Sequence, residues 1–233
     1  MQQLRVTYVA GVVPGKWIDR FTERYPRVEL RAQRLDEGDP LPLLAGGEAD
    51  VVFVRFAPGH NPRDETRHVI PLYEELPVLC AAKDHDVEYY DETIPAADAS
   101  GFPQLDLADY PEVAGGVAMA LEVVASGASV ARMPMSLARL HARKDVIYRV
   151  IQDAEPTHIG IAWLVDSDKS ELIDEFIGVV RGRSASSSRQ GSVRDKQQQG
   201  SAKARRTGKP SSGKPGKGPG PKRPARPKPR KRR

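Results

Sequence analysis

The sequence lacks the features that mark several classes of protein. Its 233 residues include one cysteine, Cys80, so an internal disulfide is impossible. No apolar run approaches the roughly 20 residues that a membrane-spanning helix needs. The segment after Met1 is strand-like and has no basic start followed by the apolar stretch of a signal peptide. We therefore expect a cytoplasmic protein without a disulfide scaffold or a membrane span.

Motifs that perform catalysis or bind metal are also missing. The five histidines lie far apart, with no H-x-x-x-H pair or nearby cysteine that would make a zinc site. No G-x-S-x-G is present, and Pro210 follows Gly208-Lys209 where a P-loop needs Ser or Thr. Asp84-His85-Asp86 resembles a base with its orienting acid, but adjacent turn residues rarely converge on one substrate atom. We expect no enzyme, no cofactor and no metal.

The charge divides the chain into two parts. Residues 181–233 have 19 Lys or Arg and one acid, Asp195, whereas residues 1–180 have 17 basic and 30 acidic residues. The net charges are therefore +18 and −13. Residues 181–233 contain no Leu, Ile, Phe, Tyr or Trp and cannot bury a core against backbone entropy. The sequence predicts a folded part over 1–180 and a disordered basic tail over 181–233.

The first part of the folded region alternates between strand and helix patterns. Leu4–Val9 reads as a strand, and Pro14 is suited to the first turn of a helix that runs to Arg24. Val28–Ala32 alternates apolar and polar residues, as a half-buried strand does. Val51–Val54 is an unbroken apolar run, typical of a parallel strand covered on both faces. This order predicts an α/β domain with parallel pairing.

The second part resumes the pattern after a polar, irregular stretch at 83–110. The expected elements are a helix at 117–125, a strand at 128–133, a helix at 135–143, strands at 146–151 and 159–165, and a last helix that begins with the capping-box-like Asp168-x-x-Glu171. Two such halves suggest two lobes. We expect subdomain I to comprise about 1–76 and 166–180, and subdomain II about 77–165.

Candidate ligand-binding residues lie where strands should end. The turn into the first helix contains Val13, Pro14, Gly15 and Lys16. Free N–H groups at a helix start favour anions, and the carboxyl edge of an open α/β sheet is where ligands bind. The same residues also fit a plain tight turn between a strand and a helix.

A second set of candidates would complete the same cleft. Arg55 and Phe56 follow the buried strand, and Gly115-Gly116 precedes a helix in the second half. Arg55 could clamp a carboxylate of the ligand with two hydrogen bonds, or pair with one of the many acids of the folded part. The glycine pair could form the opposing wall, although such pairs are common in ordinary loops.

Several segments together resemble the effector-binding domain of LysR-type transcriptional regulators. They are L-R-V-T-Y-V-A-G near the start, R-F-T-E-R-Y-P-R-V-E-L (Arg20–Leu30), L-L-A-G-G-E-A-D-V-V-F-V-R (Leu43–Arg55), P-L-Y-E-E-L-P-V-L (Pro71–Leu79) and V-V-A-S-G-A-S-V-A-R-M-P-M-S-L-A-R (Val123–Arg139). The resemblance implies a two-lobed fold of the type 2 periplasmic-binding-protein kind. It also implies a small effector between the lobes and antiparallel dimers.

The sequence departs from the family pattern in three respects. Regulators of this family begin with a helix-turn-helix domain, whereas this sequence opens at the effector-binding domain, and we expect none here. The first effector loop often supplies a hydroxyl, and Gly11-Val12-Val13 has none. The basic tail is the third departure.

The tail has the composition of an electrostatic ligand for polyanions, since its cations are spaced by Pro, Gly and Ser and no aromatic side chain is present for base stacking. The residues expected to contact nucleic acid are Lys203, Arg205, Arg206, Lys209, Lys222, Arg223, Arg226, Lys228, Arg230, Lys231, Arg232 and Arg233. Such binding should depend on salt and not on sequence. A solubilising tail, or one that binds an acidic protein or the folded part itself, fits the same composition.

We interpret the sequence as a LysR-like sensor of a small effector, for which an anion is one candidate, with a role in transcription regulation and a tail that binds nucleic acid non-specifically. Its expected partners are a second copy or a full-length LysR-type regulator, and no membrane. One alternative is a nucleic-acid-associated interaction protein with a vestigial cleft. The other is a transport-type solute-binding protein, which the missing signal peptide disfavours.

Overall fold

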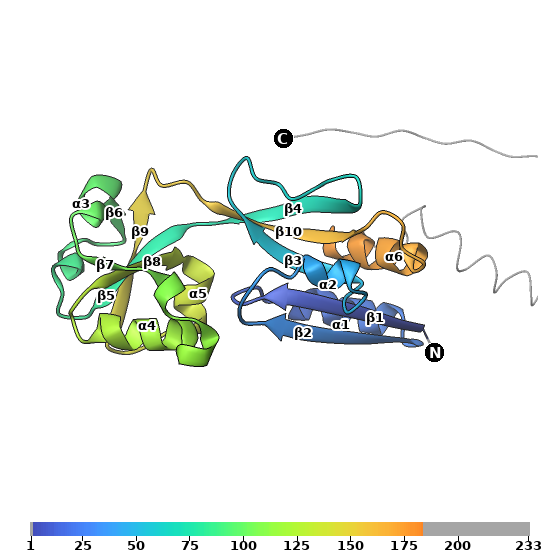
Figure 1. Cartoon of the computed structure of the whole chain (residues 1–233), viewed down its shortest axis with the longest axis horizontal. Coiled ribbons are helices and arrows are strands. Elements are labelled where there is room, and N and C mark those ends of the chain that lie inside the picture. The colour runs from blue at the N-terminus through green and yellow to red at the C-terminus, as the bar shows by residue number, and fades with distance from the viewer. Residues whose placement is uncertain (1, 184–233) are drawn as a thin grey trace, which may run out of the picture. The chain divides into compact units, whose positions relative to one another are not determined.

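The computed structural model describes residues 2–183, which form two mixed β-sheets flanked by helices (Figure 1). The first sheet has the strand order β2-β1-β3-β10-β4. Its strands are β1 (Gln2–Val9), β2 (Val28–Leu35), β3 (Val51–Phe56), β4 (Arg67–Glu75) and β10 (Thr157–Leu164). Strand β1 pairs in parallel with β2 and β3, whereas β10 is antiparallel to β3 and β4. The expected α/β class with parallel pairing is confirmed.

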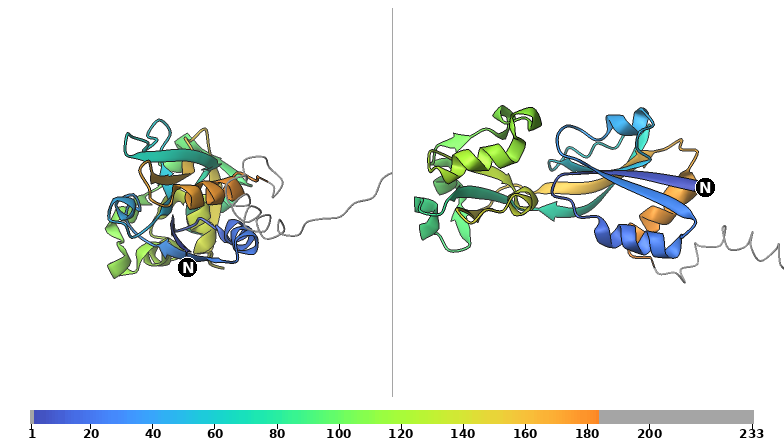
Figure 2. Two further views of the ribbon diagram at one scale, coloured as in Figure 1. Left: turned by 90° about the vertical axis from the view of Figure 1, so that its right-hand side faces the viewer. Right: turned by 90° about the horizontal axis from the view of Figure 1, so that it is seen from below.

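Strand β3 lies in the middle of this sheet and is buried on both faces. Val51 and Phe53 belong to the core beneath helices α1 (Gly15–Arg24) and α6 (Ser170–Val180). Val52 and Val54 belong to the core beneath the short helix α2 (Pro42–Ala45). Figure 2 shows α1 and α6 on one side of the sheet and α2 on the other. Successive side chains of a strand point to opposite faces, and both faces of β3 are buried. Every position of the run Val51–Val54 is therefore apolar.

The second sheet has the order β6-β9-β5-β8-β7. Its strands are β5 (Pro77–Ala82), β6 (Thr93–Pro95), β7 (Gln104–Leu105), β8 (Val130–Pro134) and β9 (Val146–Gln152). Its helices are η1 (Asp86–Tyr89), α3 (Ala96–Ser100), η2 (Leu107–Asp109), η3 (Glu112–Ala114), α4 (Gly116–Ala125) and α5 (Met135–Leu140). Side chains of α4 and α5 contribute to the core on one face, and those of η1 and α3 to the core on the other.

Two crossovers join the sheets: β4 leads into β5 through Leu76, and β9 leads into β10 through residues 153–156 (Figure 1). The chain returns to the first sheet at Thr157 and not at 166, because β10 inserts between β3 and β4. Its side chains Ile159 and Ile161 are fully buried there. Residues 157–164, which we expected at the end of subdomain II, therefore form a strand of the first lobe.

Two local expectations need correction. Helix α6 begins at Ser170 with Lys169 at its N-cap and no side-chain cap, so the capping box at Asp168 does not form. Helix α5 ends at Leu140, three residues before the expected end.

Residues 184–233 of the basic tail, with all twelve residues expected to bind nucleic acid, lie outside the described residues. Within residues 2–183, no helix has both the length and the apolar character needed to cross a bilayer.

Candidate functional site

The start of helix α1 presents the first predicted group of ligand-binding residues. Gly11 turns the chain with a left-handed φ of +89°, and Pro14 occupies the N-cap. Val13 is 83% exposed, Gly15 and Lys16 are exposed, and Pro14 is buried. No side chain caps this helix. The Trp17 N–H donates to the Pro14 carbonyl at 2.9 Å, which leaves the N–H groups of Gly15 and Lys16 at the helix start.

Arg55 is engaged by the chain's own groups. Its Nε donates to Glu75 Oε2 at 2.7 Å, and its Nη2 donates to the Ala10 carbonyl at 2.9 Å and to Ser136 Oγ at 3.2 Å. The Glu75 side chain is 4% exposed. Of the two alternatives that the sequence left open, pairing with an acid is the one observed.

Phe56 and the glycine pair also make internal contacts. The Phe56 ring stacks on His158 with centroids 5.5 Å apart. Gly115 and Gly116 have φ values of +97° and +58°, and the Glu112 carboxylate lies against Gly116. The Gly116 N–H donates to the Pro111 carbonyl at 3.0 Å. The glycines therefore let the chain enter α4 through a turn that a side chain would obstruct.

Contacts of Gly11 and Arg55 with Ser136 of α5 bring the two lobes together. A Cβ added at Gly11 would lie 2.9 Å from Ser136 Cβ and 3.2 Å from Arg55 Nη2. The turn before α1 and Arg55 are thus neighbours, and both contact the start of α5. A second bridge is formed by the Glu112 N–H, which donates to Glu37 Oε2 at 3.0 Å.

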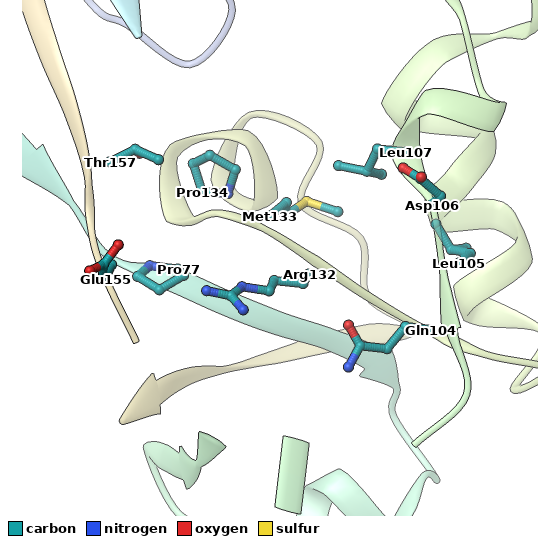
Figure 3. A pocket seen from close by; sticks show the side chains of 10 residues that line it. All are labelled: Pro77, Gln104, Leu105, Asp106, Leu107, Arg132, Met133, Pro134, Glu155 and Thr157. Atoms are coloured by element: carbon teal, nitrogen blue, oxygen red, sulfur yellow. The ribbon is translucent and has the colours of Figure 1, made fainter. Parts of the chain in front are cut away.

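A separate cleft, with a volume of about 500 Å³, lies where the second sheet meets the crossovers (Figure 3). It is lined by Pro77, Gln104, Leu105, Asp106, Leu107, Arg132, Met133, Pro134, Glu155 and Thr157. Its volume is within the usual range for small-ligand sites. None of the eight residues predicted from the sequence lines it.

The cleft combines opposite charges with an apolar wall. Arg132 is exposed on β8, and within residues 2–183 its side chain forms neither an ion pair nor a hydrogen bond. Thr157 Oγ1 is buried without a hydrogen-bond partner in the same residues. Leu105, Leu107 and Met133 supply apolar surface. Such an arrangement suits a small ligand with polar and apolar ends.

Sequence reasoning missed this cleft because its residues come from four separated segments. Arg132 is a single cation in the otherwise apolar or small stretch Val130–Pro134, which is a weak signal for a site. Glu155 and Thr157 fall in a loop and a strand end whose position depends on where β10 inserts.

Other reactive groups in the described residues offer no second site. No group of three or more His, Cys, Asp or Glu within residues 2–183 has a metal-binding arrangement. Cys80 is 1% exposed on β5, and burial raises the pKa of its thiol to about 12. A thiol with so high a pKa is almost entirely protonated at neutral pH and is a poor nucleophile.

Comparison with solved structures gives the class of fold. The reduced form of OxyR superposes with a TM-score of 0.61 at 20% identity, over 78% of this chain and 95% of that one. The BenM effector-binding domain with its effector benzoate gives 0.61 at 16% identity, over 77% and 90%. A cysteine mutant of OxyR from Corynebacterium glutamicum gives 0.59 at 18% identity, and this chain covers 64% of that longer chain. The fold is that of two-lobed regulatory domains of the type 2 periplasmic-binding-protein kind.

The family comparison agrees with the fold. Residues 3–113 match the model of the LysR substrate binding domain, and no curated protein matches the sequence. This match over residues 3–113 confirms the resemblance noted in the sequence. This family consists of regulatory domains and not of enzymes, as expected.

Proposed function

We propose that this protein senses a small effector between its two lobes, acts in transcription regulation in the cytoplasm, and binds nucleic acid non-specifically through its basic tail. The main support is the match of residues 3–113 to the LysR substrate binding domain. The cleft of about 500 Å³ at the crossovers adds physical support, because it offers charged and apolar groups to one small molecule.

Effector sensing can be tested by thermal unfolding of the full chain. A ligand at 100 times its Kd stabilises the folded state by about 2.7 kcal/mol. We expect at least one compound in a panel of aromatic acids, aliphatic acids, amino acids and amines to raise the Tm, and benzoate is a sensible first acid because it occupies the BenM domain. A panel without any stabilising compound would contradict the proposal.

The eight residues singled out in the sequence remain candidates for one side of the effector site. Lys16 and the N–H groups at the start of α1 are accessible, and they are the best placed of these to meet an anionic group. Replacing Lys16 by Gln should weaken binding of an anionic effector severalfold. The same change at Lys144, an exposed residue of the other lobe, is the matched control.

DNA binding by the tail follows from its charge of +18 beside a folded part of −13. We expect the full chain to bind duplex DNA of any sequence with a steep salt dependence, and a chain ending at Arg183 not to bind. All buried core residues of the described structure lie before that end, so the shorter chain should retain its fold.

Fluorescence anisotropy on two unrelated duplexes across a salt series tests whether the tail binds DNA regardless of sequence. Tighter binding by an isolated peptide of 184–233 would indicate that the acidic part masks the tail. Binding by the shortened chain, or a preference above about tenfold for one duplex, roughly 1.4 kcal/mol, would place DNA recognition in the folded part.

Dimerisation through α1 and α4 is also proposed, with a second copy or with a full-length LysR-type regulator. Apolar side chains are exposed next to or on these helices: Val13 is 83% exposed, Val113 97% and Met119 45%. Light scattering at tens of micromolar should report a dimer, and Met119→Glu should shift it toward monomer. A monomeric wild type would contradict this part.

An interaction protein with a vestigial cleft is the second candidate. It is favoured by Arg55 and Gly116, since the chain's own Glu75 and Glu112 occupy the places where ligand groups were expected. It predicts DNA binding without any effector-induced shift in Tm.

A further inference from the structure

The cleft lined by Arg132 has a charge pattern that selects among ligand classes. Arg132 projects from β8, where it is the register partner of Leu79 on β5. Glu155 lies in the crossover after β9, the strand on the other side of β5. Both residues line the same cleft, so a long arginine and a glutamate can approach one small molecule within it.

The charged groups gather at one end of the cleft. In Figure 3 the Arg132 guanidinium extends toward Pro77, and Glu155 lies beyond that proline, with Thr157 nearby. Neither Arg132 nor Glu155 forms an ion pair with any residue of 2–183. Both charges are available to a ligand, and Thr157, which also lines the cleft, has a buried Oγ1 without a hydrogen-bond partner in the same residues.

The other end of the cleft is mainly apolar. Leu105, Leu107 and Met133 lie away from Glu155 in Figure 3. Asp106 is also there, and its carboxylate accepts the Ala108 N–H at 2.9 Å, which caps η2. A ligand whose polar groups lie at Arg132 and Glu155 would therefore direct an apolar side chain toward the leucines.

We propose that this cleft binds a small zwitterion with an apolar side chain, of the chemical class of apolar α-amino acids. Its carboxylate pairs with Arg132 and its ammonium group with Glu155. This inference rests on the proposed effector-sensing function and names the ligand class for it. A simple carboxylate would leave Glu155 as a nearby repelling charge, and a simple amine would face Arg132 in the same way.

Arg132 is better suited to receive a carboxylate than Arg55. The Arg55 guanidinium already pairs with Glu75 and donates to Ala10 and Ser136, so a ligand would have to displace a buried carboxylate. Arg132 requires no such displacement. Its exposure also means that replacing it should leave the fold intact.

Calorimetric titration of the full chain tests the ligand class with matched probes. L-leucine and L-phenylalanine have both charges, isocaproate and hydrocinnamate lack the ammonium group, and isopentylamine and phenethylamine lack the carboxylate. We expect at least one of the two amino acids to bind, and its two analogues to bind at least tenfold more weakly. Arg132→Gln and Glu155→Gln should each weaken amino-acid binding about tenfold or more. Arg63→Gln, at an exposed arginine of the loop before β4, should have no effect.

Other outcomes overturn the proposed amino-acid ligand, and they distinguish its failure from a failure of effector sensing. Equal affinity for an amino acid and its deaminated acid would make this a plain carboxylate site. Unchanged affinity in Arg132→Gln would place the ligand elsewhere. If both amino acids fail but benzoate or another compound of the panel raises the Tm, the ligand class is wrong and effector sensing stands. If nothing binds, both proposals fail.

Discussion

Arg55 on β3 and Ser136 on α5 join the two lobes: Arg55 Nη2 donates to Ser136 Oγ at 3.2 Å, while its Nε pairs with the buried Glu75 at 2.7 Å. The same Nη2 donates to the Ala10 carbonyl, so one guanidinium connects three segments. This residue therefore acts as a structural strut between the lobes, in addition to any contact with a ligand.

Removing the cation from this strut should destabilise the protein. Arg55→Met leaves the Glu75 carboxylate buried without its partner, and breaking such a pair costs about 3 kcal/mol. The double variant Arg55→Met/Glu75→Leu should recover most of that loss, because no unpaired charge remains. Urea denaturation of both variants measures the difference. Equal stability of the single and double variants would show that Glu75 is not strongly desolvated.

The close approach of Gly11 to Ser136 predicts a second effect. Gly11→Ala must adopt a φ of +89° and place its Cβ 2.9 Å from Ser136 Cβ. Gly38 has a φ of +90° with no atom within 4 Å, so Gly38→Ala measures the backbone cost alone, about 1 kcal/mol. We expect Gly11→Ala to cost about 1 kcal/mol more than that. Equal losses in thermal unfolding would mean that the lobes can separate at this point freely.

Asp50 should contribute an acid-sensitive part of the stability. Burial alone would raise the pKa of this carboxyl, but hydrogen bonds from Arg5 and Lys169 outweigh it and hold the pKa below its ordinary value of 3.8. A carboxyl with a lowered folded-state pKa stabilises the protein above its unfolded-state pKa. That contribution is lost as the pH falls through the folded-state pKa.

Asp50→Asn should therefore destabilise the protein by about 2 kcal/mol near neutral pH. The difference from wild type should begin to shrink below about pH 4, where the carboxyl of the unfolded chain takes up a proton, and should be lost as the pH falls through the lower pKa of the folded state. Urea titrations of both proteins from neutral to acidic pH measure it, and other acids cancel because both proteins contain them. A constant difference across the series would contradict the assignment.

Cys80 should be inert in the native protein. It is 1% exposed, and burial raises the pKa of its thiol to about 12, so very little thiolate is present or accessible. A chromogenic disulfide reagent should react at once with the urea-unfolded chain and only at the opening rate with the native chain. Rapid native labelling would mean that β5 opens without global unfolding.

The sequence by itself determined most of the first lobe. The apolar run at Val51–Val54 requires a strand buried on both faces, and the spacing of Trp17, Ile18 and Phe21 requires a helix with one apolar face. These are local properties, since the period of the pattern follows from backbone geometry. The charge division near residue 180 likewise needs no structure to be seen.

Tertiary structure decided the site and the boundary between the lobes. Glu75 is remote from Arg55 in the sequence. Strand β10 inserts between β3 and β4, pairing Ile159 with Arg55 and Thr157 with Glu75, and Arg55 and Glu75 form their ion pair across it. Arg132 and Glu155, which are far apart in the sequence, line one cleft only in the folded chain. A sequence pattern reports which residues share a face of one element. Which elements become neighbours depends on how their apolar faces can be buried together, and that is a property of the whole fold.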